Sequence, residues 1–74
     1  MSDAERDAAF GALDNYRLLY MVDLAADGIC ARRIAEELKL KRNTIAWNMA
    51  RLSRRLGFAN AKEMYREYLK WVEA

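Results

Sequence analysis

The side chains best suited to bind another molecule fall within residues 43–56. A helix advances about 100° per residue. On that spacing the apolar residues of this segment form one stripe that we expect to be buried: Ile45, Met49, Leu52 and Leu56. Trp47 and Arg54 lie almost opposite the stripe, with Ala50 and Arg51 beside them. A large exposed aromatic side chain lowers solubility unless a partner covers it, so this outward face is the candidate binding surface.

Positive charge is concentrated in the middle of the chain, although the net charge is only +2. Residues 1–27 hold two basic and six acidic residues, whereas residues 32–56 hold eight basic residues against Glu36 and Glu37. Residues 57–74 are balanced, with three of each sign. A basic centre in a nearly neutral chain favours a polyanionic partner. The alternative is an ordinary solvated face that binds nothing.

Length and composition indicate one small domain that is not an enzyme. The 74 residues are 54% apolar and include no proline, which disfavours disorder. One cysteine, Cys30, excludes an internal disulfide, and the absence of histidine argues against zinc. We find no paired carboxylates or glycine-rich phosphate loop, so we expect no catalysis, metal or cofactor. The acidic start lacks an apolar signal segment and no run has transmembrane length, so we expect a cytoplasmic protein without membrane contact.

The apolar pattern predicts an all-α chain, because no segment alternates with a period of two. Ser2 and Glu5 form a capping box that starts a short helix, which makes residues 1–13 an N-terminal extension. Residues 14–74 form the main domain, whose first helix we expect Asp14 to cap. The four helices expected in this domain span about 14–27, 32–39, 43–56 and 61–74.

A short helix, a tight turn and a longer helix with arginines on its outer face are typical of a helix-turn-helix unit. The longer helix of such a unit enters the major groove, and cations near helix N-termini meet phosphates. The residues expected to contact the DNA backbone are Arg32, Arg33, Lys41, Arg42, Thr44 and Arg55. The residues expected to face the bases are Asn43, Trp47, Asn48, Ala50, Arg51 and Arg54.

The stretch AADGICARRIAEELKLKRNTIAWNMARLSRRLGFANAKEM, residues 25–64, resembles the LuxR-type (GerE-type) DNA-binding domain. The ending RLGFANAKE is the most specific part of this resemblance. The resemblance implies a four-helix helix-turn-helix domain whose third helix reads the major groove and whose last helix makes a dimer contact. It also implies a transcriptional regulator that binds double-stranded DNA. Only about thirteen residues precede the matching unit, so we expect a stand-alone homodimer or a heterodimer with a related regulator.

The sequence departs from the family pattern at two helix starts and on the base-reading face. Cys30 and Lys41 stand where the family has capping serines, although Asn43 offers a later cap. The positions that often contact bases in this family hold Ala46, Trp47 and Ala50. None of these three side chains can make a bidentate contact with a base.

The last expected helix has an apolar arc that spans roughly 160° of its circumference. The side chains on this arc, which we expect to contact a dimer or other protein partner, are Met64, Tyr65, Tyr68, Leu69, Trp71 and Val72. The alternative is that this small protein buries the whole arc in its own core.

The sequence is compatible with two functions. The first is a small DNA-binding transcriptional regulator, in which Trp47 packs on thymine methyl groups or on deoxyriboses. The second is a protein-interaction module on the same fold, such as an antagonist that pairs with another regulator. In the second case Trp47 acts as a binding hot spot between Ala46 and Ala50.

Overall fold

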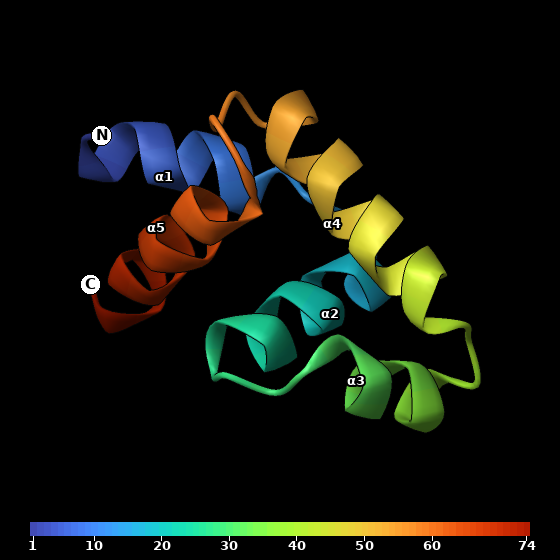
Figure 1. Cartoon of the computed structure of the whole chain (residues 1–74). Helices are drawn as coiled ribbons and strands as arrows, with labels where there is room; N and C mark the ends of the chain where they lie inside the picture. Colours follow the sequence, from blue (N-terminus) through green and yellow to red (C-terminus); the bar gives the residue numbers. More distant parts are fainter.

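The computed structural model describes all 74 residues and contains five helices and no strand. The helices in chain order are α1 (Asp3–Gly11), α2 (Tyr16–Ala26), α3 (Ala31–Leu38), α4 (Arg42–Arg55) and α5 (Ala61–Glu73). Figure 1 shows α1 lying beside α5 at one end, with α3 and the start of α4 at the other. The all-α prediction is confirmed. No helix has the length and apolar character needed to cross a membrane.

Side-chain caps fix the starts of α1 and α2. The predicted capping box is present, since Ser2 Oγ accepts the Glu5 amide at 3.2 Å and Glu5 accepts the Ser2 amide at 3.0 Å. Hydrogen bonds from the Ser2 backbone and hydroxyl lower the pKa of Glu5. Asp14 does not cap α2, contrary to expectation. Asn15 takes that place and accepts the amides of Arg17 and Leu18, because α2 begins at Tyr16.

Neither α3 nor α4 has a side-chain cap. Cys30 and Lys41 occupy the N-cap positions, and neither accepts a cap hydrogen bond. Asn43 is not the later cap that we expected, because α4 already starts at Arg42 and Asn43 lies within its first turn. The connection between the two helices turns at Lys39, whose backbone is left-handed with φ of 58°.

One hydrophobic core joins all five helices. Its buried members are Phe10, Met21, Val22, Ile34, Ala35, Ile45, Met49, Leu52, Phe58, Met64 and Tyr68. The stripe predicted on α4 is confirmed at Ile45, Met49 and Leu52, while Leu56 is half-buried at its end. The N-terminal extension belongs to this core, because Phe10 of α1 is only 1% exposed.

Aromatic and charged contacts attach α1 to α5. The ring of Phe10 lies 5.5 Å from Tyr68 and 5.6 Å from Trp71, measured between ring centroids. Arg6 Nε donates to Glu67 Oε1 at 3.0 Å, and Trp71 Nε1 donates to an Asp7 carboxylate oxygen at 3.1 Å. These contacts make α1 an integral cover for one side of α5.

Candidate nucleic-acid interface

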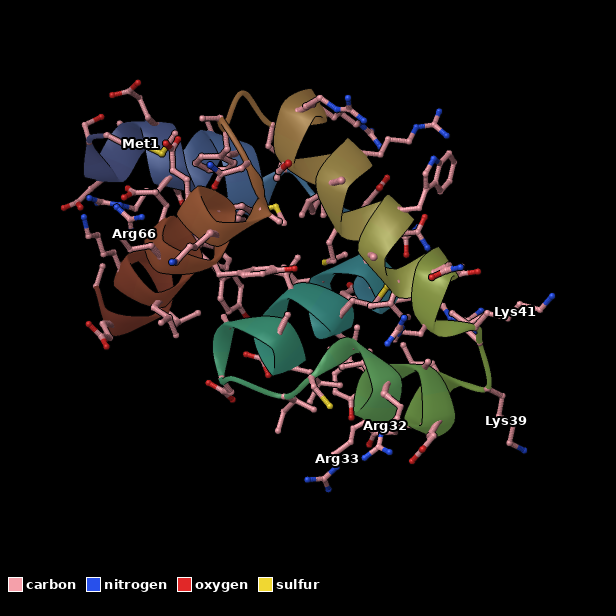
Figure 2. All side chains as sticks on the ribbon, viewed as in Figure 1. Met1, Arg32, Arg33, Lys39, Lys41 and Arg66 are labelled. Atoms are coloured by element: carbon pink, nitrogen blue, oxygen red, sulfur yellow. The ribbon has the colours of Figure 1, made fainter.

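The α3–α4 unit presents uncompensated positive charge. The connection between α3 and α4 consists of residues 39–41, and the Leu40 amide closes it by donating to the Ala35 carbonyl at 2.8 Å. Figure 2 shows Arg32 and Arg33 projecting from α3, and Lys39 and Lys41 projecting from the connection, all away from the helical body. The ion pairs of the chain join only residues of α1 and α5. The cations of α3 and α4 are therefore free to meet an anion.

The side chains expected to contact phosphate lie mostly at the surface. The exposed ones are Arg32, Arg33, Lys41, Arg42 and Arg55. Thr44 is half-buried and lines a depression of about 300 Å³ between α2 and α4. Among the neighbouring acids, Glu37 is engaged with Tyr20, whose hydroxyl donates to it at 2.9 Å. This hydrogen bond is the main cause of the raised pKa of Tyr20.

Trp47 and Arg51 form one stacked pair on the outward face of α4. Trp47 is 58% exposed, and the Arg51 guanidinium carbon lies 5.0 Å from the centroid of its ring. A cation at this distance is attracted by the negative face of the indole. Neither side chain makes a hydrogen bond within the chain, and both are exposed. The exposed residues that surround the pair are Asn43, Ala46, Ala50 and Arg54.

Asn48 does not share this outward face. It is half-buried and turns toward α2, where it lines two depressions together with Leu18. The larger depression has a volume of about 320 Å³ and also includes Arg51 and Arg55. Asn48 therefore lies at the border of the exposed face, beside α2, and its contact with a base stays a prediction.

Two further cations that the sequence alone does not indicate belong to this region. Arg17 of α2 lines the depression that includes Thr44, and it donates to the Leu38 carbonyl at 3.1 Å. It thereby satisfies one of the free carbonyls at the end of α3. Lys39 lies on the α3–α4 connection. Only the packing of α2 against α3 could reveal Arg17, since its own segment is not basic.

Cys30 lies at the start of α3 and is exposed. The Arg33 backbone amide is the main cause that lowers the pKa of its thiol, with a further contribution from the Arg32 charge. The position agrees with a thiol that replaces a capping serine. No group of three or more Cys, Asp and Glu side chains is arranged to hold a metal ion.

The expected partner surface on α5 is largely occupied by the chain itself. Met64 and Tyr68 are buried in the core, so the prediction that they contact a partner is wrong. Trp71 is half-covered by α1 through Phe10 and Asp7. The rest of the arc remains accessible to different degrees: Tyr65 and Leu69 are half-buried, and Val72 is 51% exposed.

An apolar groove of about 300 Å³ lies on the other side of α4, toward α5. Its walls are Ala25, Ile29, Ala31, Ile34, Ile45, Ala46, Met49, Ala61 and Tyr65. Burial raises the pKa of the Tyr65 hydroxyl at this groove. The face of α4 is thus bordered by polar depressions toward α2 and by an apolar groove toward α5.

Comparison with known proteins identifies no relative. No protein-family model, no curated protein and no solved structure matches the chain. Support for a function therefore comes from the geometry and chemistry of the residues described above and from the sequence pattern of residues 25–64.

Proposed function

We propose that this protein binds double-stranded DNA as a small transcriptional regulator, with α4 in the major groove. The observation that supports the proposal most strongly is the set of unpaired cations on α3, the connection and α4, while the ion pairs of the chain lie on α1 and α5. A polyanion neutralises such a surface and releases its counterions. The resemblance of residues 25–64 to the LuxR-type helix-turn-helix domain supports the same proposal.

The proposed complex divides the cations between two tasks. Cations at helix starts and in the α2 depressions, such as Arg32, Arg33 and Arg55, contact phosphates and set the position of the protein. The exposed centre of α4, formed by Trp47, Arg51 and Arg54, meets the base edges. Because the phosphate contacts carry no sequence information, discrimination between sequences depends on this centre.

We further propose that pairing with a second copy, or with a related regulator, uses the accessible part of α5. Tyr65, Leu69 and Val72 are spaced so that they form one strip of the helix. Leu69→Glu would then reduce the mass measured by light scattering from that of a dimer to that of a monomer. A monomeric mass for the unmodified protein would contradict this pairing and leave DNA binding to single copies.

The DNA-binding proposal is tested by the salt dependence of binding to random-sequence duplex DNA. We expect anisotropy titrations to show affinity that falls steeply as salt is raised. Arg32→Ala and Arg33→Ala should each reduce the slope of log affinity against log salt by about 0.9. Arg66→Ala removes the same charge from α5, at the opposite end of the molecule (Figure 2), and should leave the slope unchanged. Equal effects of all three variants would contradict the assigned surface.

Indole fluorescence provides a second readout of the same binding event. In a Trp71→Phe background Trp47 is the only tryptophan, and it reports on α4 directly. Quenching or a spectral shift of Trp47 on addition of duplex DNA is expected. Salt-dependent binding that leaves Trp47 unchanged would place the DNA on another face of the molecule.

A protein-interaction module is the second candidate, favoured by the apolar groove between α4 and α5. Ala46 lines this groove beside Trp47, so a partner that covers the indole would also reach the groove. A folded protein that binds no duplex even at low salt would favour this second function over the first.

A further inference from the structure

We propose, on the basis of the DNA binding proposed above, that Trp47 selects sites by contacting a pyrimidine 5-methyl group. Arg51 acts as the positioning residue that holds the indole for this contact.

Trp47 projects farther from α4 than the residues on either side of it. Ala46 and Ala50 are exposed and end at Cβ, so no neighbouring side chain on that flank stands between the indole and a partner. At 58% exposure, most of the ring is available for contact. When α4 enters a groove, the indole is therefore accessible to the groove floor.

The chemistry of the indole limits what it can recognise. It offers one N–H donor and no acceptor, so it cannot make the paired hydrogen bonds that identify guanine or adenine. Its remaining surface is apolar. The apolar feature that base pairs display in the major groove is the C5 methyl group of thymine, or the same group on 5-methylcytosine.

The contact with Arg51 favours one orientation of the indole. Its guanidinium carbon stacks 5.0 Å from the ring centroid, one helical turn after Trp47. The stack occupies one face of the ring and leaves the other face and the edge free. Because this contact already favours one orientation of the ring, binding a methyl group costs less conformational entropy than it would for a freely rotating side chain.

The inference is tested with pools of short random-sequence duplexes that differ only in methyl groups. One pool contains thymidine, a second contains deoxyuridine in its place, and a third carries deoxyuridine with 5-methylcytosine in place of cytosine. We expect the unmodified protein to bind the thymidine pool about three- to tenfold more tightly than the deoxyuridine pool, as expected for one or two buried methyl groups. The third pool should recover part of the lost affinity.

Variants assign the effect to the pair. Trp47→Ala should bring the ratio of the two affinities close to one, whereas Trp47→Phe, which keeps an apolar ring, should retain most of it. Arg51→Ala should lower the ratio as well as the overall affinity. Arg33→Ala is the matched control for charge, and it should weaken binding to both pools equally without changing their ratio.

The outcomes separate this inference from the function on which it rests. Salt-dependent binding with equal affinity for the thymidine and deoxyuridine pools would overturn the methyl contact and leave DNA binding intact. A ratio that survives in Trp47→Ala would also overturn it, because the methyl group would then be sensed elsewhere or through duplex stiffness. Binding to neither pool would overturn both proposals.

Discussion

The Nε atom of Arg6 lies 3.0 Å from the carboxylate Oε1 of Glu67, and this contact joins α1 to α5 across 61 positions of the chain. Both side chains are almost fully buried, and Lys70 Nζ completes the site by donating to the second carboxylate oxygen at 3.2 Å. Burial acts to raise the pKa of Glu67, but the hydrogen bonds from Arg6 and Lys70 outweigh it and lower the pKa below its ordinary value. The folded state therefore holds this carboxylate in its charged form.

Acid should weaken the fold through this carboxylate. A lowered pKa in the folded state stabilises the protein above the ordinary value of 4.5, and the stabilisation is lost as the pH falls through the folded value. Glu67→Gln should be less stable near neutral pH and should lose less stability between pH 5 and 3. Urea denaturation followed by circular dichroism measures both effects. Glu73→Gln, at an exposed site on the same helix, is the control, and identical pH profiles for Glu67→Gln and the unmodified protein would contradict the role.

Alkali should act through Tyr68. Burial and the 2.8 Å hydrogen bond that its hydroxyl donates to Asp23 raise the pKa of Tyr68 to about 12. A raised folded pKa gives stability that is complete below the ordinary value of 10 and is lost as the pH rises toward 12. Tyr68→Phe should cost about 1–2 kcal/mol of the free energy of unfolding at pH 7. Its deficit relative to the unmodified protein should shrink between pH 10 and 12, whereas Tyr16→Phe, at an exposed site, should show neither effect.

The uncapped starts of α3 and α4 predict a conflict between stability and binding. Lys41→Ser supplies the missing side-chain cap on α4 and should raise the free energy of unfolding by about 0.5–1 kcal/mol. The same change removes a cation from the proposed phosphate surface and should weaken DNA binding. Cys30→Ser gives α3 a cap without changing charge, so it should stabilise the protein while leaving DNA affinity unchanged. Equal DNA affinities for both variants would remove Lys41 from the interface.

Lys39 is a second position at which a substitution should raise the free energy of unfolding. Its left-handed backbone costs a residue with a side chain more than it costs glycine. Lys39→Gly should therefore raise the free energy of unfolding by about 0.5–1 kcal/mol. Lys39→Ala removes the same charge without relieving the backbone and should give no gain. Similar unfolding midpoints for the two variants would show that charge, not conformation, decides the outcome.

Local patterns predicted the helices and the inner face of α4. The spacing of Ile45, Met49 and Leu52 identifies a buried stripe, because helical periodicity depends only on residues three or four positions apart. The capping box at Ser2 is equally local. The cap of α2 was misplaced by one residue because Asp14 and Asn15 both have side chains suited to capping, and only the helix start distinguishes them.

Relations between distant helices could not be predicted in the same way. An apolar arc on α5 shows how much of the helix avoids water. It does not show which flank the chain itself covers, so the burial of Met64 and Tyr68 in the core could not be predicted from it. The pattern of α4 alone does not show that α2 lies beside it, so the half-buried setting of Asn48 could not be predicted. Arg17 was missed for the same reason.

The two ends of the chain meet on the side of the molecule away from the α3–α4 connection (Figure 1). Asp3, Ala4, Asp7, Trp71 and Ala74 line one shared depression of about 350 Å³ there. A short glycine-rich bridge could therefore close the backbone into a ring without crossing the basic face. Since a ring has fewer unfolded conformations than an open chain, the cyclised protein should melt at a higher temperature and leave the proposed DNA surface unchanged.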